Sequence, residues 1–489
     1  MTEGLRPPLQ RTAHAHEPNE DDLEKLKKWQ EARLERKLRG EYESAVFNLA
    51  ELINKNLETP LTVTSVRVDG ATNTRGSFLG WLIQPWLARH TDDRASKSNN
   101  LQGALYTARG ISHILQETDL FHSVHAEIQR SRDHLAKDGD VDIVINTREK
   151  GRFYLKSATE FGNNEGSVSL TGRVRNVFGG AELLEGHYSA GTKTRRSFHG
   201  LLSLPLSPSL RTTGQISLFS LERDLSTFAS CSEISHGLKA AINSDWGAHG
   251  VHEVAYQAVL RHINNLAPSA SVSIREHAGQ TIKSSISHTW TKDTRDDKLA
   301  ASRGYYGKLF QELAGLSGDV SFYKAEIESQ ISRRLVPGMS LSLAVRSGIL
   351  KALSGHSHFS DRFQLGGPLS LRSFRANSLG PRDGVDSLGG DIYWSTGASL
   401  VSDIPRKPHW PIKSHIFVNA GRLDAVDGTK GLGENIMGCL RRPSISAGVG
   451  LIYRFDPVRV EVNFGVPLFA SKSDGVRRGF QVGIGMEFL

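Results

Sequence analysis

The chain has 489 residues, which is too many for one ordinary soluble domain, and it carries 60 Lys and Arg against 52 Asp and Glu for a net charge of +8. This mild basic excess allows contact with an anionic membrane surface, but no stretch reads as the dense basic stripe of a nucleic-acid-binding protein. The two cysteines, Cys231 and Cys439, lie far apart, which excludes a disulfide framework and fits no zinc-binding spacing.

Residues 1–58 are predicted to be a disordered start followed by a helix. Residues 1–17 hold prolines and mixed polar side chains with little to bury, whereas Asn19 can cap a helix whose leucines recur among dense charges. The helix over 19–58 is either a docking element for a partner or a helix packed on its own domain. Because no secretory signal, transit peptide or long apolar run is visible, we expect neither a cleaved leader nor a helical membrane anchor.

Residues 59–150 have the pattern of a compact α/β domain. Alternating apolar residues predict strands, and near-helical apolar spacing predicts helices between them. The predicted elements are a strand at 61–68, helices at 76–87 and 101–116, and strands at 121–128 and 141–146. The element order is therefore β-α-α-β-β in about 90 residues, a plausible size for one domain.

Residues 151–489 change character, because no helical period survives and short alternating segments are separated by Gly, Ser, Asp, Asn and Pro. The clearest segments are 458–466 and 480–488, where apolar and polar or glycine residues alternate. A strand that is apolar on one face and charged on the other fits a soluble sandwich or a membrane barrel with a polar lumen. Gly433 and its neighbours are interpreted as loop glycines.

A transmembrane barrel is the favoured reading of 151–489. These 339 residues, divided over sixteen strands, leave roughly 21 residues for each strand with its turn, and no predicted helices cover the sheet. A closed barrel also pairs every backbone group in lipid, which an open sandwich does not. The predicted fold class is an all-β transmembrane protein: a 16-stranded antiparallel outer-membrane β-barrel preceded by one small α/β domain.

No arrangement of residues points to catalysis. The chain has no GxSxG, HExxH, P-loop or paired-carboxylate motif, and its 19 histidines are scattered in a way typical of lumen and loop residues. We therefore expect no enzyme activity, no catalytic residue, no metal ligands and no cofactor.

The segment 364–374 reads Gln-Leu-Gly-Gly-Pro-Leu-Ser-Leu-Arg-Ser-Phe. It resembles the long loop of the bacterial surface antigen superfamily, the barrels that assemble or secrete other proteins. In that family the loop folds back into the lumen and carries an aliphatic-Arg-Gly-aromatic tetrad. The tetrad here is Leu371, Arg372, Ser373 and Phe374, so Ser373 replaces the usual glycine. The resemblance implies that Arg372 pins the loop against the barrel wall.

Two further segments and the N-terminal domain share this resemblance. The segment 416–421 is similar to the family's Phe-x-Asp-x-Gly strand, with Phe417, Asn419 and Gly421 as the implied wall residues. Because Asn419 stands where aspartate is common, we expect a charge-assisted hydrogen bond from Arg372 there in place of an ion pair. The segment 448–453 resembles the family's glycine-rich closing hairpins. The domain at 59–150 resembles a polypeptide-transport-associated (POTRA) domain, which leaves 151–489 as the barrel.

With a single such domain and no secretory signal, the chain is most similar to the mitochondrial branch of the family, the core barrel subunits of the sorting and assembly machinery. The resemblance implies insertion and folding of β-barrel precursors into the mitochondrial outer membrane, with the small domain in the intermembrane space. The implied partners are β-barrel precursors, membrane lipids, cytosol-facing accessory subunits and contacts of the small domain, with no nucleic acid.

The resemblance also implies a lateral gate between the first and last barrel strands, where a precursor strand pairs by β-augmentation. The predicted first strand consists of Phe153, Tyr154, Leu155, Lys156, Ser157, Ala158, Thr159 and Glu160. The family's sorting signal, polar-x-Gly-x-x-hydrophobic-x-hydrophobic, is matched by the chain's own last strand at Gln481, Gly483, Met486 and Phe488. Either a substrate signal displaces this strand, or the strand merely fits a loose pattern. The alternative function is a protein- or metabolite-conducting pore without insertase activity.

Overall fold

The computed structural model describes residues 20–38, 52–88, 100–134, 136–162, 165–405, 410–455 and 458–485. These residues form two compact units. Thr72–Leu82 and Glu117–Leu120 belong to the same unit as the residues from Glu149 onward. The predicted helix over 19–58 is described as α1 (Glu20–Leu38), with helical residues again at 52–55. The predicted disordered segment, 1–17, and residues 39–51 lie outside the described residues.

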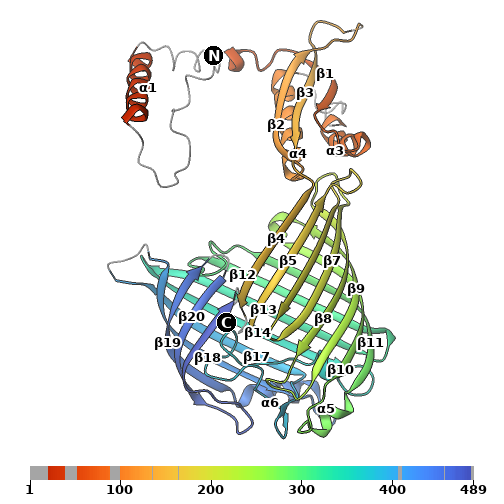
Figure 1. The fold of residues 1–489 in the computed structure, drawn as a ribbon, viewed down its shortest axis with the longest axis vertical. Coiled ribbons are helices and arrows are strands. Elements are labelled where there is room, and N and C mark those ends of the chain that lie inside the picture. The colour runs from red at the N-terminus through yellow and green to blue at the C-terminus, as the bar shows by residue number, and fades with distance from the viewer. Residues whose placement is uncertain are drawn as a thin grey trace. The chain divides into compact units, whose positions relative to one another are not determined.

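The small α/β region has the predicted order of elements. They are β1 (Thr62–Asp69), α3 (Gly76–Ala88), α4 (Leu101–Glu117), β2 (Phe121–Arg130) and β3 (Asp140–Glu149). The sheet order is β1-β3-β2, with β1 and β3 parallel (Figure 1). Ile111 and Leu115 of α4 and Ile143 and Ile145 of β3 are completely buried, as the helical and alternating periods of the sequence predict.

The described residues from 153 onward form a 16-stranded sheet with antiparallel neighbours, and this confirms the predicted fold class. Its strands are β4 (Phe153–Gly162), β5 (Glu165–Arg175), β6 (Leu183–Gly191), β7 (Thr194–Pro205), β8 (Thr212–Asp224), β9 (Ser232–Asp245), β10 (Val251–Asn264), β11 (Gly279–Asp293), β12 (Gly304–Gly318), β13 (Phe322–Val336), β14 (Met339–Ala352), β17 (Ile392–Asp403), β18 (Ile412–Asp424), β19 (Ser444–Phe455), β20 (Val458–Phe469) and β21 (Gly479–Gly485).

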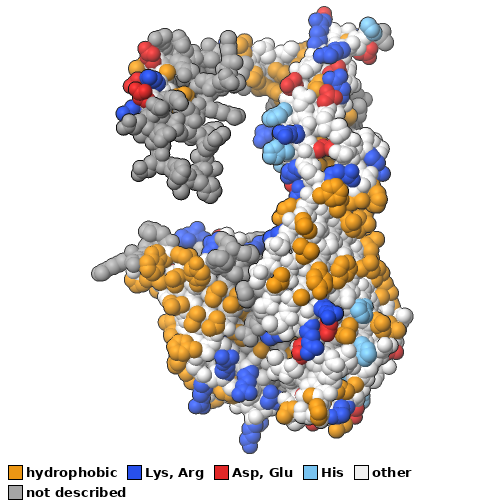
Figure 2. Space-filling model, in the orientation of Figure 1, with side chains coloured by type: hydrophobic (Ala, Val, Ile, Leu, Met, Phe, Trp, Pro, Cys, Tyr) orange, Lys and Arg blue, Asp and Glu red, His pale blue; other side chains and the backbone are white. Residues whose placement is uncertain are grey.

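The sheet exposes apolar side chains on its outer face. On β10, Val254, Tyr256 and Leu260 are exposed, whereas the intervening Ala255 and Val259 are buried. Hydrophobic side chains accordingly spread over the outer surface of the strands (Figure 2). A barrel wall in lipid needs apolar side chains on its outer face, because lipid tails offer no hydrogen-bonding partner to a polar group. Among the described helices, none has the length and apolarity to cross a membrane.

The prediction that no helix follows residue 151 is wrong at two loops. Helices α5 (Val272–Glu276) and α6 (Leu432–Arg441) lie there, and Gly433 belongs to α6 and not to a loop. Both helices are shorter than four turns, so the period of their apolar residues is too brief to stand out among alternating strands. Each has one buried side chain, Ile274 in α5 and Cys439 in α6.

A long loop connects β14 to β17. This lumen loop, residues 353–391, contains the short strands β15 (Arg382–Asp383) and β16 (Asp386–Ser387). Its apolar side chains form one packed cluster with inward-facing wall residues. The cluster consists of Phe363, Leu365, Leu371, Phe374 and Leu379 from the loop and Ala314, Phe322, Ala344, Leu350, Tyr393 and Leu423 from the strands. Burial of each large side chain contributes about 1.5–3 kcal/mol, so the cluster contributes strongly to holding the loop inside the barrel.

Candidate functional site: the tip of the lumen loop and the terminal strands

Arg372 lies at the tip of the lumen loop and is almost completely buried. Its Nη2 lies 3.0 Å from Oε2 of Glu461, and its Nε donates to the same oxygen at 3.1 Å. The side chains of Arg372 and Glu461 are 1% and 0% exposed, so water screens neither charge. A guanidinium presents its donors as a fixed fork that matches a carboxylate, which makes this the strong form of an ion pair.

The predicted wall residues lie around the same guanidinium. Nη1 of Arg372 donates to Oδ1 of Asn419 at 3.3 Å, and the guanidinium lies 4.9 Å from the centre of the Phe417 ring. A Cβ on Gly421 would lie 2.9 Å from Leu371 Cδ1, so glycine leaves space for the loop. The Asn419 contact is a charge-assisted hydrogen bond, and the full ion pair is made instead with a residue of a different strand.

Glu461 is the functional residue that the sequence interpretation missed. The alternation over 458–466 does place Glu461 on the polar face of its strand. Which loop residue it meets, however, depends on the registers from β18 to β20, and the ion pair joins residues 89 positions apart. One signal in the sequence could have found it. A buried arginine needs an acidic partner, and an inward-facing carboxylate on the strands that follow the loop can supply one.

Further polar groups extend this cluster beyond Arg372. Arg459 makes a second ion pair with Glu461, and Asn463 Nδ2 donates to Glu461 Oε2 at 2.9 Å. Arg459 Nη1 also donates to the backbone carbonyl of Leu299 at 2.8 Å. Leu299 belongs to the turn between β11 and β12, so a continuous chain of polar contacts joins that turn to the tip of the lumen loop.

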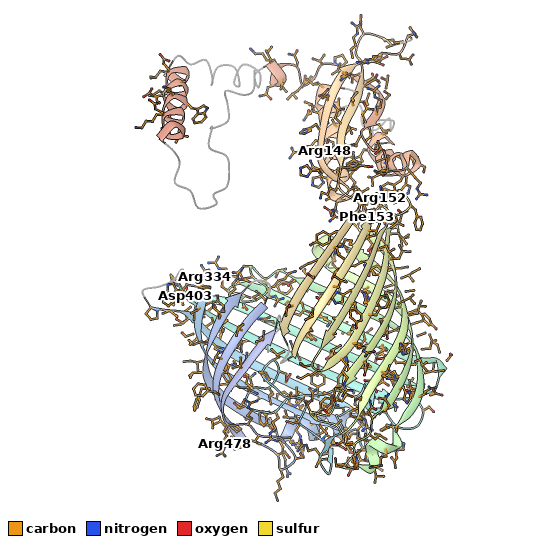
Figure 3. All side chains as sticks on the ribbon, viewed as in Figure 1. Arg148, Arg152, Phe153, Arg334, Asp403 and Arg478 are labelled. Carbon is orange, nitrogen blue, oxygen red and sulfur yellow. The ribbon has the colours of Figure 1, made fainter. Side chains whose placement is uncertain are left out.

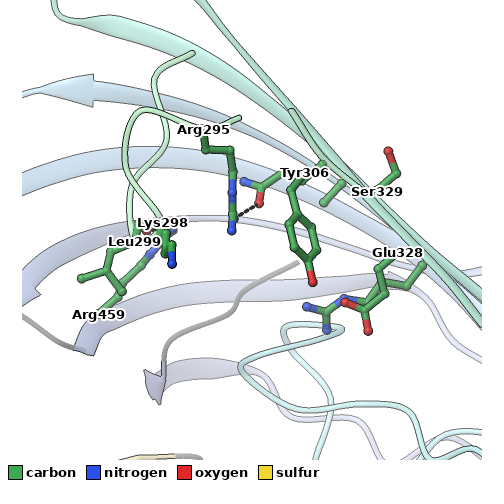
Figure 4. A pocket seen from close by; sticks show the side chains of 10 residues that line it. Arg295, Lys298, Leu299, Tyr306, Glu328, Ser329 and Arg459 are labelled. Atoms are coloured by element: carbon green, nitrogen blue, oxygen red, sulfur yellow. Dashed lines mark hydrogen bonds between the residues drawn. The ribbon is translucent and has the colours of Figure 1, made fainter. Parts of the chain in front are cut away.

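The turn at 294–303 is fastened at several points. Arg295 Nη1 donates to Gln330 Oε1 at 2.8 Å, and its guanidinium lies 4.6 Å from the centre of the Tyr306 ring (Figure 4). Asp297 pairs with Arg454 of β19 at 2.6 Å. The cavity beside these residues holds about 30 Å³, which is enough for one or two water molecules but too little for an organic ligand.

The loop tip also contacts the last described strand. The backbone N–H of Ser373 donates to Gln481 Oε1 at 2.9 Å, and Gln481 Nε2 donates to the backbone carbonyl of Phe374 at 2.9 Å. We call these two hydrogen bonds the tip clamp. Ser446 Oγ donates to the carbonyl of Arg372 at 2.6 Å, so side chains of the wall bind three backbone groups of the tip. Because Gln481 belongs to β21, the tip clamp ties the loop to one of the two terminal strands.

The backbone of Ser373 explains why glycine is usual at this place. Its φ angle is +68°, in the left-handed region where a side chain costs about 1–2 kcal/mol. The Ser373 side chain also points at β20, where a Cβ on Gly465 would lie 2.2 Å from Ser373 Oγ. The Ser373 hydroxyl would therefore have to move before a side chain could be placed at 465.

Gly465→Ala is expected to destabilise the barrel by about 1–3 kcal/mol through overpacking, because its methyl group would overlap Ser373 Oγ. The double variant with Ser373→Gly should recover most of this loss, since it removes the overlapping atoms and relieves the strained backbone. Urea unfolding in vesicles measures both. Gly186→Ala is the control because open space surrounds that position. Equal unfolding midpoints for the single and double variants would contradict the argument.

A second buried ion pair fastens the first part of the lumen loop. Arg261 of β10 lies 2.9 Å from Asp361, and their side chains are 5% and 4% exposed. His358, close by in the loop, is also buried. Burial, together with the nearby charge of Arg261, lowers the pKa of His358 to about 4.

This loop is expected to loosen in acid. An unfolded histidine has a pKa near 6.5, so the unfolded state binds the proton first and the folded state loses stability as the pH falls from about 6.5 towards 4. The loss reaches about 3 kcal/mol at most. His358→Gln should remove this part of the pH dependence, which urea unfolding at pH 7 and at pH 4.5 measures. An unchanged acid dependence in the variant would assign it to another group.

The predicted gate residues occupy the two ends of the sheet. Within the described residues, β4 is paired only with β5, and β21 only with β20. Phe153, Tyr154 and Leu155 at the start of β4 are 81%, 49% and 73% exposed, so both faces of this strand are open (Figure 3). Lys156 to Thr159 continue the strand; the side chain of Glu160 lies outside the described residues.

On the last strand, Gln481 and Gly483 are buried, whereas the outward-facing Val482 is exposed. Met486 and Phe488, the two hydrophobic positions of the predicted signal, lie outside the described residues. The structure thus brings the loop tip, the wall residues and Gln481 into one cluster. Among the described residues β4 approaches β21 without being hydrogen-bonded to it, so β4 forms the other end of the sheet.

A model of the Omp85 superfamily domain matches residues 176–488, which is more than half of the chain and includes the loop tip, β18, β20 and Gln481. The chain belongs to the Omp85 superfamily. The family resemblance predicted from the tetrad is therefore confirmed.

Named relatives of this Omp85 chain cover most of its length. A SAM50-like protein of Schizosaccharomyces pombe is 33% identical over 454 residues, covering 91% of this chain and 95% of the relative. Sorting and assembly machinery component 50 homolog B of Xenopus laevis is 32% identical and covers 82% of this chain and 87% of its own. The human homolog of component 50 is 30% identical, with 80% and 85% covered.

A solved structure has the same fold. BamA from Haemophilus ducreyi, lacking POTRA domains 1–3, superposes with a TM-score of 0.71 over 86% of this chain and 84% of its own. At 15% sequence identity this likeness concerns the fold alone.

Proposed function

We propose that this chain inserts and folds β-barrel precursors into the mitochondrial outer membrane, with its N-terminal domain in the intermembrane space. The names of its relatives, components of a sorting and assembly machinery, support this role. The observation that carries it is the open order of the sheet, because β4 and β21 each have one hydrogen-bonded neighbour among the described residues. The role requires no catalytic group, metal or cofactor.

The free edge of β4 is the proposed template. In lipid, each unpaired N–H or C=O costs several kcal/mol, so an incoming strand that pairs with Phe153–Glu160 gains a large driving force. The edge that would be an aggregation hazard in a soluble sheet becomes the binding site for a precursor strand. The precursor's next strands can then pair one after another while the membrane supplies no competing hydrogen bonds.

The tip clamp restricts which precursor strands can replace β21. A precursor strand that takes the place of β21 must replace Gln481, which both accepts from Ser373 and donates to Phe374. An amide or hydroxyl side chain meets that requirement, and an aliphatic one does not. This supports the polar position of the sorting signal, with Gln481 and Gly483 as its counterpart in this chain. The buried ion pair between Arg372 and Glu461 keeps the loop tip in place while the strands exchange.

Partners other than precursors belong to the same proposal. Lipids surround the apolar outer face of the barrel. Accessory subunits would bind on the cytosolic side, and the α/β region would contact proteins of the intermembrane space. The alternative of an open pore receives less support, because apolar loop residues such as Phe363 and Phe374 pack against the inner wall.

Disulfide crosslinking tests the proposal. Single cysteines are placed along Phe153–Glu160 and presented with a radiolabelled barrel precursor that has one cysteine in its last strand. We expect crosslinks in one register, weakened when the glycine of the precursor's signal is replaced. The native Cys231 and Cys439 are buried and do not compete.

The matched control is the same scan along β8, whose two edges are both paired. Crosslinks to β8 as frequent as those to β4 would mean that the precursor collides without pairing. In a companion variant with a second cysteine in β21, a disulfide between β4 and β21 that persists while precursor crosslinks are absent would mean a closed barrel, and the pore would then be the better proposal.

A further inference from the structure

Helix α6, between β18 and β19, lies at one end of the barrel and is fastened to β17 and β18 there (Figure 1). At its start, Asn435 accepts from the N–H of Asp427 and donates to the Asp427 carbonyl, both at 3.1 Å. Near its end, Trp394 of β17 donates its indole N–H to the carbonyl of Cys439 at 3.1 Å, and the Cys439 side chain is buried. The helix therefore has a fixed position on the wall.

The contacted wall is the lipid-facing side. Trp394 lies opposite Ser347 on the neighbouring strand, and Ser347 lies opposite Ile327 on the strand after that. Side chains at directly opposed positions share a face of the sheet, and Ile327 is 55% exposed on the outer one. Helix α6 consequently lies beside the surface that the membrane covers.

The helix leaves its own apolar side chains uncovered. Leu432, Ile436, Met437 and Leu440 are 48%, 39%, 58% and 48% exposed. They recur at positions i, i+4, i+5 and i+8, so they form one continuous arc, with Gly438 on the other side of the helix. Four large apolar side chains on a ten-residue helix are a costly surface in water but a typical one at a membrane interface.

A crevice separates this arc from the wall. Its volume is about 210 Å³, and its lining includes Ile327, Ile349, Ile392, Trp394, Ile436 and Leu440. The lining is apolar and continuous with the lipid-facing surface through Ile327. A slender apolar chain that comes from the bilayer fits such a crevice, whereas a polar ligand would lose its hydration there.

Cationic side chains lie close in the chain to residues that line this crevice, since Arg441 follows Leu440 and Lys351 is two residues beyond Ile349 on the same face of β14. Arg441 and Arg442 at the end of α6 are exposed, and so is Lys351, which lies opposite Tyr323 at the end of β14. Arg422 fixes the backbone at this place by donating to the carbonyl of Arg442 at 3.2 Å. Trp and Tyr side chains gather at the level of lipid headgroups, and exposed cations there attract phosphate.

We infer that α6 and the outer wall of β14 and β17 form a binding site for an anionic glycerophospholipid of the adjoining leaflet. One acyl chain occupies the apolar crevice, and the phosphate lies against Arg441, Arg442 and Lys351. The site is independent of precursor insertion, so it stands or falls separately from the proposed function. A protein subunit on the same surface is the outcome that the experiment must distinguish.

Photo-crosslinking distinguishes these occupants. p-Benzoylphenylalanine is placed at Leu440, on the apolar arc, or at Gly438, on the opposite side, in the full chain within intact outer membranes. We expect adducts with the mass of a phospholipid at Leu440, at least severalfold more abundant than at Gly438. Protein adducts at Leu440 without lipid adducts would overturn the inference and identify a subunit-binding surface.

The headgroup is tested by charge. The double variant Arg441→Gln, Arg442→Gln is purified from vesicles of phosphatidylcholine and phosphatidylinositol, and bound lipid is counted by native mass spectrometry. Each basic residue near an anionic surface contributes about a fivefold preference, so we expect phosphatidylinositol retention to fall roughly 25-fold for the two.

The matched control is Arg477→Gln, Arg478→Gln. These two arginines are exposed at the same end of the barrel, away from α6 (Figures 1 and 3). Their replacement should leave retention unchanged, and an equal loss in both double variants would reduce the site to non-specific attraction. Heat-dependent gel migration verifies that both variants are folded.

Discussion

Replacing Arg372 with alanine is expected to release the tip of the lumen loop and abolish precursor insertion. The substitution removes the fork that binds the completely buried Glu461, together with the contacts to Asn419 and Phe417. Removing one partner of a buried ion pair costs about 3–5 kcal/mol. Two measurements follow the change: the urea midpoint of the barrel in vesicles, and the yield of a radiolabelled precursor inserted by the reconstituted chain.

Two matched variants isolate the role of the fork. Arg375→Ala removes an exposed arginine of the same loop and should leave both measurements unchanged. Arg372→Lys keeps the charge but not the planar pair of donors, so it should fall between the wild type and Arg372→Ala. Full insertion activity in a folded Arg372→Ala variant would show that the loop tip has no part in the exchange.

Gln481→Leu is expected to loosen the last strand. Leucine is similar in size but makes neither hydrogen bond of the tip clamp, so the N–H of Ser373 and the carbonyl of Phe374 lose their partner at a buried site. Each unsatisfied group costs about 1–3 kcal/mol. In the absence of precursor, the yield of a disulfide between single cysteines on β4 and β21 should fall severalfold, because β21 leaves its place more often.

Val482→Leu is the control for this prediction. Val482 faces outward and is 48% exposed, so its replacement alters the same strand without touching the loop. Gln481→Glu keeps an acceptor for Ser373 and loses the donor to Phe374, and its crosslink yield should be intermediate. If Gln481→Leu and Val482→Leu gave the same yield as the wild type, the tip clamp would have no influence on the last strand.

Local patterns in the sequence were sufficient for most of the architecture. Alternation in 458–466 predicted β20, and helical spacing in 101–116 predicted α4, because each period is a property of neighbouring residues. The tetrad also located the loop tip at Arg372, since its aliphatic, arginine and aromatic residues stand together in the chain.

The contacts of the tip were not predictable in the same way. The Glu461 carboxylate and the Gln481 amide contact the loop because of two features that local patterns do not contain. These are the registers of the strands and the fold of the 39-residue connection, 353–391. Gln481 was singled out for its match to a sorting signal, and its hydrogen bonds to Ser373 and Phe374 had no counterpart in the pattern. Helix α6 was missed because ten residues hold less than three helical turns.

The contact between Ser373 and Gly465 also constrains how this sequence can have changed over time. Where glycine stands at both positions, the serine can appear without a clash, but beside a larger residue at 465 its hydroxyl would have to leave the present position. Once Ser373 is present, a side chain at 465 costs stability that it would not cost opposite a glycine. Related chains with a residue larger than glycine at 465 should therefore have glycine at the tip more often than chains with glycine at 465.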